Sequence, residues 1–380
     1  MQIKEVPDTL VQFLALLKEN GISEDEYQKY IGDFFEFSSR QKGIPLHGTF
    51  ELTPLCNLNC KMCYVHLSNS QFGCEKLLSA NILKKVIDEA YECGMRKASL
   101  TGGECLTYPC FEEIFLYLYE KGVRTNILTN GVLLNKQRIE FFKKFRPKSI
   151  QVTIYGSNND AYEKVTGKRV FDTVKENIQN VHNAGLPIRL SITPSAFMRG
   201  DVLNTLELAD QLKIPFNINA SLFQARGNTG RQFEDLTVDE YIEVYKKRNE
   251  LRHYNETITV DLKELPDPGV SSNNSMGLKC GAGRSSFVIK YDGTMSPCVS
   301  LYDIISYPLK YGFEQAWREI NLKVNEYIRP AECVDCFYST VCLKCVAFHE
   351  KAPAGHCDRR ICQRTMKMVS AGVLPIPGKL

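Results

Sequence analysis

The chain has 380 residues, of which 43% are apolar and 24% are charged, and its formal net charge is +3. This composition is typical of a soluble globular protein with room for two or three domains. So small a net charge gives no support for binding to nucleic acid or to an acidic membrane surface. There is no charged-then-apolar leader, and no apolar run approaches the ~18 residues that a membrane span needs, so we expect a cytoplasmic protein.

Three regions follow one another along the chain. Residues 1–46 are predicted to form a mostly polar helical segment, because apolar side chains recur there at helical spacing. Residues 47–255 alternate short strands with amphipathic helices, and residues 256–380 contain turn signals and closely spaced cysteines. The apolar positions that support the first helical segment are Leu10, Phe13, Leu14 and Leu17.

The central region is predicted to be an α/β domain. Strands are expected at His47–Leu52, Lys97–Thr101, Arg124–Leu128, Ile150–Ile154, Ile188–Ile192 and Phe216–Asn219. Helices are expected at 79–93, 110–121, 135–145, 171–184, 201–211 and 237–252. This alternation predicts a parallel sheet, and six units are too few for a closed eight-stranded barrel. We therefore expect a partial (β/α)6 TIM-like barrel that binds its ligands at the carboxyl ends of the strands.

Cysteine is the one abnormal component of the sequence. There are fifteen, and eight of them follow residue 279. A disulfide-stapled secreted protein is normally short and carries a signal peptide. In a chain of this length without such a signal, closely spaced cysteines more often bind metal.

The first cysteine motif follows the first predicted strand. Cys56, Cys60 and Cys63 place three thiolates within eight residues, enough for three corners of a [4Fe–4S] cluster. Three ligands leave one iron open to a substrate, by the logic that separates catalytic from structural zinc sites. A zinc knuckle is the alternative, but zinc favours four ligands and no second cysteine pair follows nearby.

This motif resembles the signature of the radical S-adenosylmethionine (SAM) superfamily, in which three cysteines are spaced by three and two residues. The resemblance implies that the open iron chelates the amino and carboxylate groups of SAM. It also places Met62 and Tyr64 close to the adenine.

Two further segments are similar to that family. The stretch Thr101-Gly102-Gly103-Glu104 resembles the segment whose backbone binds the SAM amino group, although Cys105 replaces the usual proline. Thr153 on the fourth strand matches a position that contacts SAM. Further candidate contacts are Ser191 and Arg226, for which a purely structural role is an equally open alternative.

The late cysteines resemble the SPASM domain, a radical SAM extension that holds two auxiliary [4Fe–4S] clusters. The helical stretch Phe313–Trp317 also matches this domain. The resemblance assigns one auxiliary cluster to Cys333, Cys336, Cys342 and Cys362. It assigns the other to Cys280, Cys298 and Cys345, with either an open iron or Cys357 as the fourth ligand.

One departure keeps a second metal under consideration at these cysteines. Two residues rather than the usual three separate Cys342 from Cys345. Residues 333–345 therefore also fit a zinc site built from two Cys-x2-Cys pairs.

The resemblance implies reductive cleavage of SAM to a 5′-deoxyadenosyl radical and oxidative modification of a substrate. The first expectation is a thioether or carbon–carbon cross-link in a ribosomally made peptide. A separate leader-recognition protein and an electron donor such as flavodoxin or ferredoxin are the expected partners. The alternatives are dehydrogenation of a small sugar or alcohol, sulfatase-maturase-like oxidation (disfavoured by Val299) and a non-catalytic metal-binding role.

Overall fold

The computed structural model describes most of the central region and much of the two ends. The described residues are 9–24, 27–65, 77–219, 235–251, 278, 280–301, 303–327, 330–333, 336–339, 341–342 and 359–376.

One open sheet of eight strands organises the molecule, in the order β6-β5-β4-β3-β2-β1-β7-β8. Each neighbouring pair from β6 to β7 is parallel, and β7 pairs with β8 antiparallel. All six predicted strands are present, each within one residue of its predicted ends, and the partial barrel-like α/β fold is confirmed. The strands are β1 (His47–Glu51), β2 (Lys97–Thr101), β3 (Arg124–Thr129), β4 (Ser149–Ile154), β5 (Ile188–Ile192), β6 (Phe216–Ile218), β7 (Ser286–Ile289) and β8 (Met295–Ser296).

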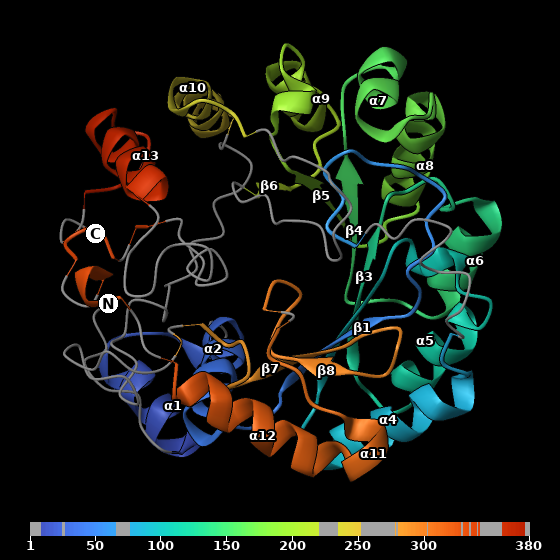
Figure 1. The fold of residues 1–380 in the computed structure, drawn as a ribbon, viewed down its shortest axis with the longest axis vertical. Coiled ribbons are helices and arrows are strands. Elements are labelled where there is room, and N and C mark those ends of the chain that lie inside the picture. Colours follow the sequence, from blue (N-terminus) through green and yellow to red (C-terminus); the bar gives the residue numbers. More distant parts are fainter. Residues whose placement is uncertain are drawn as a thin grey trace.

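Amphipathic helices cover the outer side of this curved sheet (Figure 1). All six predicted helices are present, within two residues of their predicted ends. They bury apolar faces into one continuous core with the strands, which is what their spacing of apolar residues requires. They are α4 (Ala80–Glu92), α5 (Phe111–Glu120), α6 (Lys136–Lys144), α8 (Phe171–Asn183), α9 (Val202–Gln211) and α10 (Val238–Glu250). A further short helix, α7 (Asn159–Thr166), follows β4.

The sheet continues beyond the predicted strands on the other side of β1. The buried run Phe287, Val288 and Ile289 forms β7, which lies parallel to β1. The ring of Phe287 packs against Phe50 of β1 and Phe313 of α12, with centroids 6.1 and 4.8 Å apart. Only two residues of β8 follow, and so short a strand carries too little periodicity to be found from sequence. Two helices close this end, α11 (Pro308–Tyr311) and α12 (Phe313–Asn325), and the second contains the helical stretch expected from the SPASM resemblance.

The predicted N-terminal helices form a small core of their own. They are α1 (Leu10–Glu19) and α2 (Tyr27–Lys42). Phe13 and Leu17 of α1 pack with three aromatic residues of α2, which are Tyr30, Phe34 and Phe37.

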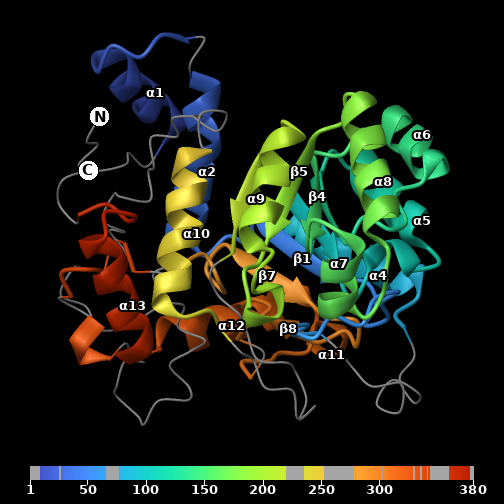
Figure 2. The same cartoon turned by 90° about the horizontal axis from the view of Figure 1, so that it is seen from above.

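At the C-terminal end, α13 (Arg359–Ser370) lies beside α10 (Figure 2). Arg364 of α13 pairs with Asp235 just before α10, with 3.1 Å between Nη1 and Oδ2. None of the helices in the described parts of the chain is long and apolar enough to cross a membrane.

Candidate active site

The three cysteines of the first motif lie in the loop that follows β1, which we call the cluster loop (residues 52–65). Cys56 is exposed, Cys60 is buried and Cys63 is half-buried. Burial raises the pKa of the Cys56 thiol to about 11, although the residue as a whole remains exposed, and raises the pKa of Cys60 further. The neighbouring thiols also contribute to both shifts. Metal binding favours the thiolate and would replace these protons.

The start of the cluster loop runs alongside the Gly-Gly-Glu turn that follows β2. The N–H of Gly103 donates to the carbonyl of Thr53 (2.7 Å), and the N–H of Glu104 donates to the carbonyl of Leu55 (2.8 Å). A Cβ at Gly102 would lie 2.3 Å from the Thr53 oxygen, and one at Gly103 would lie 2.3 Å from the Leu55 oxygen. Gly102 also has a φ of +146°. Two glycines are therefore needed here so that the two backbones can touch.

These hydrogen bonds decide which backbone atoms of the turn are left for a ligand. The N–H groups of Gly103 and Glu104 are used by the cluster loop. Within the described residues, no donor reaches the carbonyl oxygens of Gly102 and Gly103. Those oxygens are acceptors, so this turn suits a ligand that donates hydrogen bonds, such as an ammonium group.

The Glu104 side chain acts as an internal brace between the ends of β2 and β3. It is 1% exposed, and burial raises its pKa. Its carboxylate accepts from the Thr129 hydroxyl (2.8 Å), the Asn130 N–H (2.7 Å) and the Leu106 N–H (3.1 Å). The backbone of Glu104 is engaged as well, because its N–H donates to Leu55 and its carbonyl accepts from the N–H (3.0 Å) and the hydroxyl (2.7 Å) of Thr107. A contact between Glu104 and SAM therefore stays a prediction.

The segment that follows β4, which includes Tyr155 and α7, supports the cluster loop from another side. The N–H groups of Asn59 and Lys61 donate to the carbonyls of Thr166 and Val165, both at 2.9 Å. These carbonyls belong to the last turn of α7, where a helix has no partners of its own for them. The Tyr155 hydroxyl, directly after β4, forms a hydrogen bond with the Cys60 sulfur.

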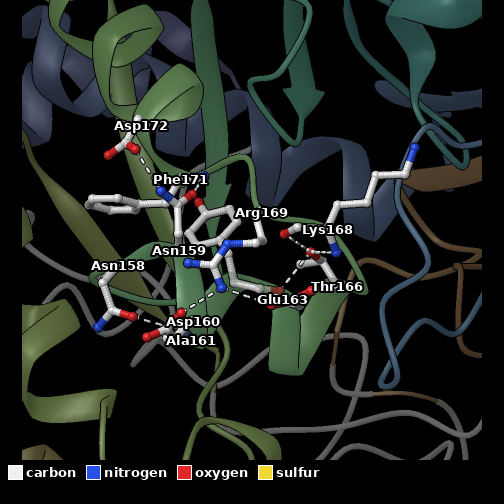
Figure 3. A network of polar contacts seen from close by, with 11 residues as sticks. Asn158, Asn159, Asp160, Ala161, Glu163, Thr166, Lys168, Arg169, Phe171 and Asp172 are labelled. Atoms are coloured by element: carbon white, nitrogen blue, oxygen red, sulfur yellow. Dashed lines mark hydrogen bonds and ion pairs between the residues drawn. The ribbon is translucent and has the colours of Figure 1, made fainter.

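A polar network holds α7 in the position that this docking requires (Figure 3). Asn158 caps its first turn by accepting the Ala161 N–H at 2.9 Å. Arg169 forms ion pairs with Asp160 and Glu163 on the exposed face of α7, with its Nη1 2.5 and 2.8 Å from their carboxylate oxygens. At the other end, the Thr166 hydroxyl donates to the Tyr162 carbonyl, and Asn159 connects α7 to α8 through the N–H of Phe171.

The remaining predicted SAM contacts divide into three groups. Met62 is buried in the main core, and Tyr64 is half-buried. Thr153 and Ser191 are register partners on β4 and β5, and Ser191 accepts a hydrogen bond from Asn219 at 2.9 Å. Arg226 lies outside the described residues.

The late cysteines are described only in part, and Cys345 and Cys357 lie outside the described residues. Cys280 is exposed, and Cys298, Cys333, Cys336, Cys342 and Cys362 are half-buried and free of disulfides. The Thr365 hydroxyl donates to the Cys342 sulfur at 3.8 Å, which brings α13 and its Cys362 to this group. In the described parts of the chain, no three His, Cys, Asp or Glu side chains converge on a point where one metal ion would fit. A four-iron cube holds its cysteine sulfurs further apart than a single ion does.

Comparison with protein families identifies the part of the chain that contains this site. The model of the radical SAM superfamily matches residues 50–212, which include the cluster loop and the Gly-Gly-Glu turn. Residues 50–212 therefore form a radical SAM domain.

The matches to two curated relatives extend beyond the radical SAM domain. The chain is 28% identical over 266 residues to AlbA of Bacillus subtilis, the antilisterial bacteriocin subtilosin biosynthesis protein, covering 68% of this chain and 56% of AlbA. It is 25% identical over 321 residues to the AdoMet-dependent heme synthase of Methanosarcina barkeri, covering 78% of this chain and 90% of that protein.

Among solved structures, SuiB of Streptococcus suis bound to S-adenosylmethionine matches with a TM-score of 0.66 at 15% identity, over 93% of this chain and 88% of SuiB. A second SuiB structure, bound to the precursor peptide SuiA, gives a TM-score of 0.64. At this identity the likeness establishes a shared fold that includes and extends beyond the radical SAM domain.

The contact between the two backbones gives a direct test at Gly103. We expect Gly103→Ala to lower the free energy of unfolding by roughly 1–3 kcal/mol, because the new Cβ collides with backbone atoms that cannot rotate away. Denaturant unfolding followed by circular dichroism measures this change. Gly32→Ala in α2 is the control, since a Cβ there meets no atom within 4 Å. Equal stability of the two variants would contradict the close approach.

Proposed function

We propose that this chain is a radical SAM enzyme in which Cys56, Cys60 and Cys63 bind three irons of a [4Fe–4S] cluster. The observation that carries the proposal is the cluster loop, which is contacted by the segments that follow β2, β3 and β4 and has no fourth cysteine in its motif. When bound, the cluster and SAM supply one-electron cleavage of SAM and a radical that removes hydrogen from an unactivated C–H bond. The protein's own contribution is to bind SAM in one orientation and to exclude water from it.

The SAM-binding residues of the proposal surround the cluster loop. The carbonyls of Gly102 and Gly103, which accept no hydrogen bond within the described part of the chain, would accept from the SAM amino group. Met62 and Tyr64 would lie against the adenine, as the family resemblance implies. The remaining contacts that we propose are Thr153, Ser191, Arg226 and Glu104.

The late cysteines are proposed to hold two auxiliary [4Fe–4S] clusters. Cys333, Cys336, Cys342 and Cys362 would form one set. The other set would be Cys280, Cys298 and Cys345, with Cys357 or an open iron completing it. A nearby cluster of suitable potential can take an electron from a substrate radical, which makes the net reaction oxidative.

The proposed substrate is a ribosomally made peptide that receives a thioether or carbon–carbon cross-link. AlbA takes part in bacteriocin biosynthesis and SuiB binds a precursor peptide, and both similarities support a peptide substrate. A low-potential electron donor such as flavodoxin or ferredoxin, and a separate leader-recognition protein, are the proposed partners. A small molecule is the second candidate for the substrate, because this chain matches 90% of the length of a heme synthase.

The proposal is tested by producing the chain anaerobically together with a small cysteine-containing peptide encoded beside its gene. Mass spectrometry should show the peptide lighter by a pair of hydrogens for each bond formed, together with 5′-deoxyadenosine. Ala replacements at Cys56, Cys60 and Cys63 should abolish both products. Cys93→Ala, which removes a free thiol at the end of α4, should change neither.

Two results would contradict this assignment. One is a protein that contains zinc without labile sulfide, and the other is turnover that survives loss of the three cysteines. Production of 5′-deoxyadenosine with an unmodified peptide would instead favour the small-molecule substrate.

A separate variant tests the auxiliary clusters. We expect Cys342→Ala to keep 5′-deoxyadenosine formation but to lose the cross-linked peptide, because the substrate radical would lack its electron acceptor. Cys110→Ala, another free thiol, is the matched control. Full cross-linking by Cys342→Ala would exclude a role for its cluster in the reaction.

A further inference from the structure

Asn130, the residue directly after β3, directs its side chain at the cluster loop. It is buried, with 5% of its surface exposed. Its Nδ2 lies 3.7 Å from the sulfur of Cys56 and 2.7 Å from Oδ1 of Asn57. The side chain thus reaches a proposed iron ligand from a neighbouring strand.

The surrounding backbone determines which end of the Asn130 amide faces the sulfur. The N–H of Val132 donates to Oδ1 of Asn130 at 3.1 Å. Because a backbone N–H can only donate, the atom that faces it must be the oxygen. The NH2 group is therefore left to face Cys56.

The main chain of Asn130 is also fixed. Its N–H donates to the buried carboxylate of Glu104 at 2.7 Å, and Glu104 is itself part of the turn that contacts the cluster loop. The donor is thus held at both its backbone and its side chain before any ligand binds. A donor held in this way loses little conformational freedom when the sulfur becomes charged.

We propose that Asn130 is a positioning residue whose N–H···S hydrogen bond to Cys56 raises the reduction potential of the catalytic cluster. This inference rests on the proposed function, because it requires Cys56 to be an iron ligand. Reduction adds one electron from an external low-potential donor, dithionite in the experiment, and no bond forms or breaks. The added negative charge spreads over the sulfurs, where an N–H dipole stabilises it.

Two substitutions remove the donor in different ways. Asn130→Asp keeps the oxygen that accepts from Val132, whereas Asn130→Leu removes both polar atoms. The potential is measured by redox titration monitored by electron paramagnetic resonance, on protein with complete iron and sulfide content. We expect both variants to be at least roughly tenfold harder to reduce, which is ~59 mV for a one-electron couple.

Asn177→Leu is the matched control. Asn177 on α8 is 8% exposed, and its amide donates to the carbonyls of Gly131 (2.9 Å) and Val132 (3.1 Å). It therefore supports the same turn as Asn130 without contacting a sulfur, and its loss should leave the potential unchanged. An unchanged potential in the Asn130 variants, or an equal shift in Asn177→Leu, would overturn the proposal.

Failure of this inference can be distinguished from failure of the proposed function. The signal of the catalytic cluster is the one that the triple Ala variant at Cys56, Cys60 and Cys63 lacks. If that variant keeps every signal, the proposed cluster site is wrong. If both Asn130 variants lose the cluster, pulsed resonance decides on the Asn57→Asp protein with 15N in its remaining asparagine side chains, since Asn57 also lies beside Cys56. Coupling of that nitrogen to the cluster supports the hydrogen bond, and its absence overturns it.

Discussion

The close contact between the backbone of Thr53–Leu55 and the backbone of Gly102–Glu104 is the constraint on which the site depends. It fixes the first residues of the cluster loop relative to β2, at a separation that no side chain larger than hydrogen allows. The contact also uses the N–H groups of Gly103 and Glu104 and, among the described residues, leaves the carbonyls of Gly102 and Gly103 for a ligand. A single pair of glycines thus positions the cysteines and shapes the adjoining acceptor site.

Neutral hydrogen bonds, rather than charges, support the thiols from the neighbouring strands. Asn130 after β3 reaches Cys56, and Tyr155 after β4 reaches Cys60. The nearby carboxylate, Glu104, is buried behind them and occupied by three donors. Burial raises the pKa of the Cys56 and Cys60 thiols, and metal binding would replace their protons and leave the same donors facing the thiolates.

The fold of the central region could be predicted because its signals are local. The spacing of apolar residues placed every strand from β1 to β6 and every long helix between them to within two residues. Strand β7 was missed because its four residues carry no periodicity and pair with β1, which is far away in the sequence. The cysteine spacing likewise indicated the cluster loop, whereas the contacts that Asn130 and the last turn of α7 make with this loop were missed. Their contacts depend on which strand ends become neighbours, and no spacing within one segment records that.

We propose that the fourth iron of the catalytic cluster has no protein ligand and binds SAM. The most direct measurement is electron–nuclear double resonance of the reduced enzyme with SAM labelled with 15N at its amino group or with 17O at its carboxylate. Both labels should couple to the cluster signal that depends on Cys56, Cys60 and Cys63. A complete cluster that shows no coupling to either label would contradict it.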